Sequence, residues 1–209
     1  MKTLFIHRSV GQNLIAEGRL RELLHAYDIA LDDYDNNTGT LTAYDNSTIT
    51  NSITIPGNNT NPDNLAQYFK KWDELLENYD SIMVKSCYPN SHIKNESQFK
   101  KMQQSYVAVF EAFMSHRKQV VLLTSPPLRP LFTNREEARL VAKLNEWLLG
   151  SVNQYVRVLD FHALLAEPRG RHMGMLHRDY RRLLPYDNHP NKKANREIAP
   201  LVANFLAAN

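Results

Sequence analysis

The sequence is poor in cysteine and glycine and contains no long apolar run. Its 209 residues include one cysteine, Cys87, and seven glycines, and the formal net charge is only +3. A single cysteine excludes an internal disulfide and a cysteine-based metal cluster. The absence of a run of about eighteen apolar residues excludes a membrane-spanning helix. So small a net charge gives no reason to expect nucleic-acid binding. We therefore expect neither nucleic acid nor a membrane among the partners.

The remaining composition is typical of one soluble globular domain. Hydrophobic residues make up 43% of the chain and charged residues 22%, and the length suits a single domain over residues 1–209. The first seven residues carry one basic side chain and too short an apolar stretch for a signal peptide. A cytoplasmic protein is therefore the default expectation, although a signal peptide trimmed from the N-terminus would leave the same sequence.

Basic residues gather between residues 169 and 196. This segment holds eight of them (Arg169, Arg171, Arg178, Arg181, Arg182, Lys192, Lys193 and Arg196) but few acidic residues. A solvated face beside a loop is the simplest interpretation. A mouth that attracts anionic substrates is the alternative, and the sequence leaves both open.

Strand-like and helix-like segments alternate along the chain. Apolar runs predict strands over residues 3–6, 28–33, 81–85, 119–124 and 156–161, and amphipathic spacing predicts helices after residue 9 and over 62–78, 97–116, 135–149 and 192–208. Residues 34–64 are polar and predict a long loop, with an edge strand at 52–55. The alternation favours a parallel sheet with helices on both faces, in which ligands bind beyond the carboxyl ends of the strands.

Ser9 stands at that edge, directly after the first strand and at the start of a helix. A serine hydroxyl there faces the free N–H groups of the first helical turn, which favour developing negative charge. It still needs a neighbouring base to act as a nucleophile. A helix-capping serine is the competing interpretation.

His189 is the candidate base. It lies just before the last helix, where Pro190 suits the first helical position. Asp187, two residues earlier, lies on the same side of an extended segment and is placed to orient the imidazole. A turn capped by Asp187 and Asn188 explains those two residues equally well but leaves His189 unexplained.

Two loops offer groups for an oxyanion hole. Gly57 provides a backbone N–H unshielded by a side chain, and Asn90, after the third strand, provides an amide donor. Either residue alone is an ordinary turn residue.

Ser9, Gly57, Asn90 and His189 follow one another in an order that resembles the SGNH/GDSL hydrolase family, and the likeness covers essentially the whole chain. Its most specific piece is Asp187-Asn188-His189-Pro190-Asn191. The resemblance implies a flavodoxin-like three-layer α/β/α sandwich with a central, mostly parallel five-stranded sheet. It also implies a serine esterase that cleaves an acyl or acetyl ester of a carbohydrate or lipid, without metal or cofactor, and an oxyanion hole formed by Ser9, Gly57 and Asn90.

The chain departs from the family pattern at three places. His7-Arg8-Ser9 replaces Gly-Asp-Ser. Tyr186 occupies the position of the family's aspartate, three residues before the histidine, so the site is either a Ser9–His189 dyad or a triad completed by Asp187. The third block lacks the usual Gly-x-Asn-Asp, which leaves Ser86 and Asn58 as alternatives to Asn90.

His7, Arg8 and Tyr88 are the candidate substrate contacts, with a structural role as the alternative for His7. The other histidines are scattered without metal-ligand spacing, so we expect no metal. A second function remains open: a catalytically degenerate domain of the same scaffold that binds a glycan or another ligand. The identity of the ester and the oligomeric state do not follow from the sequence.

Overall fold

A six-stranded sheet forms the centre of the molecule. The computed structural model describes residues 1–49, 62–69, 77–88, 92–116 and 118–208. The strands are β1 (Lys2–His7), β2 (Ala30–Asp35), β3 (Thr40–Thr42), β4 (Ser81–Lys85), β5 (Gln119–Leu123) and β6 (Val156–Leu159). Their order across the sheet is β3-β2-β1-β4-β5-β6. All neighbours run parallel except β3, which pairs antiparallel with β2.

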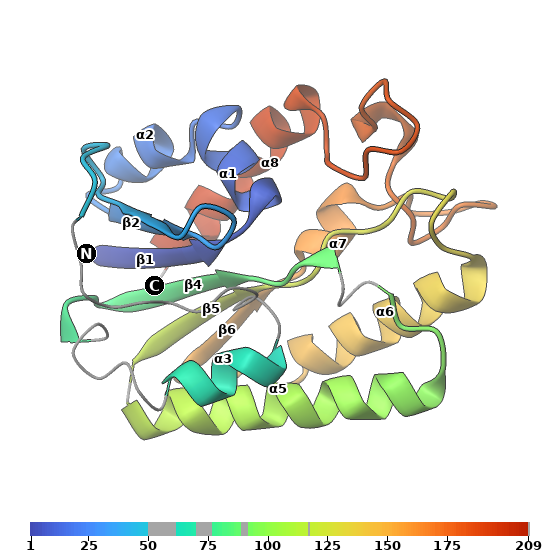
Figure 1. Ribbon diagram of the computed structural model, residues 1–209, viewed down its shortest axis with the longest axis horizontal. Helices are drawn as coiled ribbons and strands as arrows, with labels where there is room; N and C mark the ends of the chain where they lie inside the picture. Colours follow the sequence, from blue (N-terminus) through green and yellow to red (C-terminus); the bar gives the residue numbers. More distant parts are fainter. Residues whose placement is uncertain (50–61, 70–76, 89–91, 117, 209) are drawn as a thin grey trace.

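Helices cover both faces of this sheet (Figure 1). One layer consists of α1 (Ser9–Ala16), α2 (Leu20–His25) and α8 (Lys192–Ala207), and the other of α3 (Pro62–Phe69), α5 (Glu96–His116) and α6 (Arg135–Leu149). The short helix α7 (Phe161–Leu165) follows β6, and the 3-10 turn η2 (Arg178–Tyr180) precedes α8. This is the three-layer α/β/α sandwich expected from the sequence. No helix among the described residues is long and apolar enough to cross a membrane.

The strand count differs from the sequence expectation by one. Strand β3 lies inside the polar segment 34–64, which was expected to be mainly loop. Its three residues are too few to produce a hydrophobic period, so no pattern marked it. The edge strand expected at 52–55 falls outside the described residues.

The strands are apolar on both faces because both are covered. In β1, Leu4 and Ile6 pack in the core beneath α3, α5 and α6, whereas Phe5 between them packs in the core with α1, α2 and α8. All three side chains are completely buried. The alternation places consecutive residues on opposite faces and decides which side chains approach α1 at the end of the strand.

A close approach of α8 divides the first helical region into α1 and α2. A Cβ on Gly18 would lie 2.6 Å from the Leu14 carbonyl oxygen and 2.7 Å from that of Asn195, which is on α8. The next residue, Arg19, has a positive φ of 59°. Both features turn the chain, and the helix that follows residue 9 in the sequence prediction is therefore two helices.

Candidate active site

Ser9 is the first residue of α1, and one residue, Arg8, separates it from the end of β1. Arg8 takes the N-cap position in an extended conformation, with φ −129°, and its side chain makes no capping hydrogen bond. No side-chain oxygen of the cap therefore competes for the N–H groups of the first helical turn. The Ser9 side chain, which is partly exposed, lies at the carboxyl edge of the sheet beside the positive end of α1.

His189 lies within hydrogen-bonding distance of Ser9 although 180 residues separate them. The distance from His189 Nε2 to Ser9 Oγ is 2.7 Å. On the other side of the ring, Asp187 Oδ1 lies 2.6 Å from His189 Nδ1, and the same oxygen accepts the backbone N–H of His189 at 2.8 Å. Nδ1 carries the proton in this arrangement, which leaves Nε2 as the acceptor for the serine hydroxyl.

The charges around Asp187 favour its ionised form. Burial acts to raise the pKa of this carboxyl group, but the hydrogen bonds from His189 and the nearby charges of His189 and Arg182 outweigh it and lower the pKa. Arg182 Nε lies 3.8 Å from Asp187 Oδ2, and an Nη atom of the same guanidinium donates to Glu17 Oε1 at 2.8 Å. Asp187 is therefore held as a carboxylate, the state that orients and stabilises an imidazolium.

Arg129 fixes the backbone of the segment that carries Asp187 and His189. Its Nη1 donates to the carbonyl oxygens of Leu184 at 2.5 Å and Asp187 at 3.0 Å, and its backbone N–H donates to Asn188 Oδ1 at 3.1 Å. The sequence did not point to this residue. An arginine in a loop after a strand belongs to no pattern from which its hydrogen-bond partners in another loop could be predicted.

Tyr88, a predicted substrate contact, packs against His189. Its hydroxyl donates to the Asn188 carbonyl oxygen at 2.5 Å, and its ring meets the His189 ring edge-on at 5.7 Å between centroids. Burial raises the pKa of Tyr88 well above its ordinary value. The phenol therefore stays a neutral donor at physiological pH.

His7 is not placed to contact a substrate, which corrects the sequence expectation. The side chain is completely buried, with Nε2 2.8 Å from Asp33 Oδ2 and Nδ1 3.0 Å from the Arg8 carbonyl oxygen. A Cβ on Gly11 would lie 2.3 Å from the His7 Cβ, so α1 packs directly on this ring. His7 thus supports the turn that presents Ser9. Arg8 is partly exposed, and its Nε donates to Asn37 Oδ1 at 3.1 Å.

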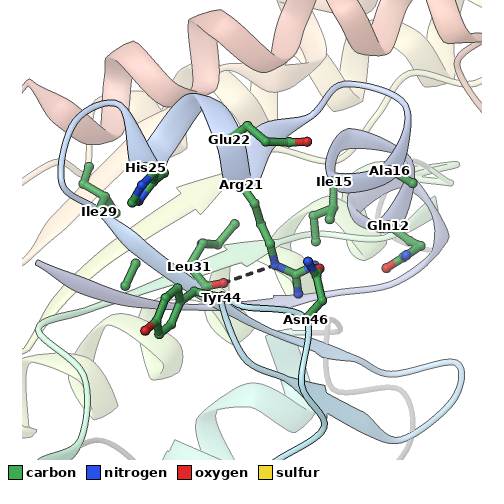
Figure 2. Close-up of a pocket in the computed structure, with 11 residues that line it drawn as sticks. Gln12, Ile15, Ala16, Arg21, Glu22, His25, Ile29, Leu31, Tyr44 and Asn46 are labelled. Carbon is green, nitrogen blue, oxygen red and sulfur yellow. Dashed lines mark hydrogen bonds between the residues drawn. The ribbon is translucent and has the colours of Figure 1, made fainter.

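A cavity of about 580 Å³ opens between α1, α2 and β2, and its lining does not include Ser9, Asp187 or His189 (Figure 2). The Arg21 side chain lines this cavity, and its Nε donates to the Leu31 carbonyl oxygen at 3.4 Å (dashed in Figure 2). The same guanidinium pairs closely with Asp33, the partner of His7. The cavity therefore borders the support beneath Ser9 and is separate from the Ser9–His189 pair.

Of the candidate oxyanion donors other than Ser9, the structure describes Ser86. Gly57, Asn58 and Asn90 lie outside the described residues. Ser86 is completely buried, and its hydroxyl contacts the Tyr106 hydroxyl, so it faces away from the reaction site. The described residues contain no group of three histidine, cysteine or acidic side chains arranged to hold a metal ion.

Lys85 is an unexpected charged residue in the core at the end of β4. It is completely buried, and its ammonium group donates to the Ser86 carbonyl oxygen at 2.7 Å. Burial lowers its pKa to about 8. The sequence analysis assigned this lysine no role.

The fold is similar to that of several ester-cleaving enzymes. The sequence matches no protein-family model and no curated protein. In structure, an acetyl xylan esterase, AlAXEase, is 18% identical with a TM-score of 0.59, and the alignment covers 100% of both chains. An assigned acylhydrolase of Bacteroides fragilis is 12% identical with a TM-score of 0.62, covering 99% of this chain and 88% of that one. The psychrotrophic esterase EstA of Pseudoalteromonas sp. is 14% identical with a TM-score of 0.54, covering 98% and 93%. At these identities the likeness shows the fold alone, the three-layer α/β/α sandwich that this chain shares with these proteins.

Proposed function

We propose that this protein is a serine hydrolase that cleaves carboxylic esters with Ser9 as nucleophile, His189 as general base and Asp187 as the group that orients the base. One observation carries the proposal: the continuous contact from Ser9 Oγ to His189 Nε2 at 2.7 Å and from His189 Nδ1 to Asp187 Oδ1 at 2.6 Å. A serine hydroxyl is activated by a base that contacts it directly, and that base is oriented by a carboxylate on its other side.

The reaction proceeds in two halves. His189 Nε2 takes the hydroxyl proton while Ser9 Oγ attacks the ester carbonyl, and the imidazolium then gives this proton to the departing alcohol. A water molecule, deprotonated by His189, attacks the resulting acyl-serine; the bond from the acyl carbon to Ser9 Oγ then breaks, the imidazolium returns its proton to Oγ, and the carboxylic acid leaves. Asp187 stays ionised throughout and stabilises the imidazolium formed in each half.

The oxyanion that forms in each half needs donors near Ser9. The uncapped N–H groups at the start of α1 are the first candidates. Gly57 and Asn90 remain proposed as the further donors. Removing one such donor lowers kcat about 10²- to 10³-fold in enzymes of this kind, so each assignment is measurable.

An acyl or acetyl ester of a carbohydrate is the favoured substrate class, with a lipid ester as the alternative. The support is the fold likeness along the entire chain to an enzyme named for acetyl xylan. A partly exposed Ser9 at an open sheet edge also suits a short acyl group carried by a larger alcohol.

The test compares Ser9→Ala with the unaltered protein on p-nitrophenyl acetate. We expect Ser9→Ala to lose nearly all turnover while keeping its circular dichroism spectrum and thermal midpoint. Ser151→Ala is the matched control, because that hydroxyl bonds within the turn after α6 at 2.9 Å from the Trp147 carbonyl oxygen. Full activity in a folded Ser9→Ala protein would refute the assignment.

A serine-directed phosphonate provides the second arm. EstA, one of the similar structures, is inhibited by monoethylphosphonate, and we expect such a reagent to add to Ser9. A folded protein that neither turns over esters nor reacts at Ser9 would support the ligand-binding alternative.

A further inference from the structure

The most exposed apolar side chains of the described residues gather in two loops beside the Ser9–His189 pair. The four highest exposures among large apolar residues belong to Leu183 (102%), Tyr186 (79%), Leu184 (70%) and Leu131 (61%). We call these four residues the apolar tip. Three of them directly precede Asp187, and Leu131 follows Arg129 by two residues. The loops after β5 and before α8, which contain them, lie at the carboxyl edge of the sheet (Figure 1).

The exposure of the apolar tip does not come from a loose loop. Arg129 Nη1 holds the carbonyl oxygens of Arg182, Leu184 and Asp187 from within. A turn bond from the Asp187 N–H to the Leu184 carbonyl oxygen, 3.1 Å, closes the tip. The polar backbone is thus bonded inward, whereas the apolar side chains point outward. A surface that fixes apolar groups in water is typical of a contact site.

Exposed basic side chains lie in the segments of the chain before and after Leu183, Leu184 and Tyr186. Arg169, Arg171, Arg178, Lys192 and Lys193 are all exposed, and these five residues are called the basic rim below. Several contacts join the rim segments to the tip loops. The Leu176 N–H donates to the Leu128 carbonyl oxygen at 2.8 Å, and Lys193 Nζ lies 5.7 Å from the centroid of the Tyr180 ring.

Acidic groups neutralise part of this surface, because Lys193 Nζ lies 3.8 Å from Glu197 Oε1 and Arg178 Nε lies 3.6 Å from Asp179 Oδ1, but an excess of basic residues remains. Residues 169–196 contain two acidic residues, Asp179 and Asp187, against eight basic ones. Asp187 is turned inward to His189 and Arg182. The outer surface beside the tip is therefore positively charged.

We propose that the apolar tip and the basic rim dock this protein on an anionic lipid surface. Leucine and tyrosine side chains at the tip enter the interfacial region, while arginine and lysine side chains contact the negatively charged head groups. A second copy of the chain fits this surface less well, because a symmetric contact would bring two basic rims together. The sequence expectation of no membrane partner rested on spanning segments, and docking at the surface needs none.

Docking would bring the carboxyl edge of the sheet, where Ser9 lies, close to the lipid surface, since Tyr186 of the tip immediately precedes Asp187 in the chain. The proposal does not depend on ester hydrolysis, because the tip and the rim make the contact and Ser9 does not. The Ser9→Ala protein is therefore expected to bind vesicles as well as the unaltered protein does. Loss of catalysis and loss of docking are separate results.

The experiment measures cosedimentation of the full chain with phosphatidylcholine vesicles, with and without phosphatidylglycerol. We expect binding only with phosphatidylglycerol, and release as salt screens the charges. The variant Leu183→Asp/Leu184→Asp should lower the partition coefficient roughly tenfold or more. Val107→Asp, an exposed apolar residue on α5 in the other helix layer, is the matched control and should bind normally.

Three results would overturn the proposal. The first is no binding of the unaltered protein to phosphatidylglycerol vesicles. The second is equal binding by the double variant, with circular dichroism showing that both proteins are folded. The third is a dimer that light scattering detects for the unaltered protein without vesicles but not for the double variant. That result would identify the apolar tip as a contact between copies of this chain.

Discussion

Asp187→Asn is the substitution that separates a catalytic triad from a dyad. The asparagine Oδ1 can still accept the His189 backbone N–H, a 2.8 Å bond, so the turn is expected to remain. The contact with the ring changes more. The same Oδ1 also accepts the Nδ1 proton, at 2.6 Å. An amide held in this turn therefore keeps the acceptor but loses the negative charge that stabilises the imidazolium.

The size of the effect follows from the charge that is lost. An imidazolium and a carboxylate about 4 Å apart attract each other by about 4 kcal/mol at an effective dielectric constant of about 20. The side chains of His189 and Asp187 are 33% and 26% exposed, so solvent and salt reduce this value somewhat. About 4 kcal/mol in the transition state corresponds to about a 10³-fold loss in kcat. We expect KM to change little, because the imidazolium forms only as the reaction proceeds.

The assay is the steady-state hydrolysis of p-nitrophenyl acetate at pH 7, at low and high salt. Asp179→Asn is the matched control, because that carboxylate lies in the same segment, is half exposed and pairs with Arg178 at 3.6 Å. It should retain the unaltered rate. A kcat for Asp187→Asn within a few-fold of the unaltered protein would refute the reasoning and leave Ser9 and His189 as a dyad.

Three further predictions concern the support of the site. Below pH 8 the buried ammonium of Lys85 costs stability, and because its pKa is about 8 when folded and about 10.4 when unfolded, the protein should gain stability as pH rises between these values. Urea unfolding of Lys85→Met should show a gain of up to about 3 kcal/mol at pH 7, since each pKa unit corresponds to about 1.4 kcal/mol, and no such pH-dependent gain. Gly11→Ala places a Cβ 2.3 Å from the His7 Cβ and should lower the free energy of unfolding by about 3 kcal/mol, read from the urea midpoint; an unchanged midpoint would show that α1 can move away. Arg129→Ala removes three carbonyl contacts of the His189 segment and should lower kcat about 10- to 100-fold on p-nitrophenyl acetate, whereas a rate equal to the unaltered one would show that Tyr88 suffices.

The layers of the fold could be predicted because each large element carries its own pattern. Helix α6 has the bounds expected from its apolar spacing, residues 135–149, and Asn134 with Glu137 forms a capping box at its start. Strand β3 and the break between α1 and α2 could not be predicted. The first is too short to show a period, and the second results from contact with α8, which is distant in sequence.

The proximity of Ser9 and His189 was easier to predict than the residues that support them. Ser9 and His189 occupy defined places in the order of strands and helices, so topology alone brings them to one edge. Helix α8 begins at residue 192, as its apolar spacing predicted, but Pro190 does not take the first helical position, because Asn191 caps the helix and Pro190 precedes the cap. Arg129 acts through backbone carbonyls of another loop, and such partners depend on loop conformation, which has no periodic signal.

Asp187 shows that the number of residues between aspartate and histidine does not by itself decide whether a carboxylate oxygen reaches the histidine Nδ1. An aspartate two residues before the histidine departs from the pattern of the resembled family, which places it three residues before. In this structure one oxygen, Asp187 Oδ1, accepts both the backbone N–H and the ring Nδ1–H of His189, at 2.8 Å and 2.6 Å. The first bond closes a two-residue turn of the kind that aspartate favours, and that turn rotates the ring toward the same oxygen. What the chemistry requires is an acceptor in the plane of Nδ1, and the shorter spacing meets that requirement because the backbone bond and the catalytic contact share an atom.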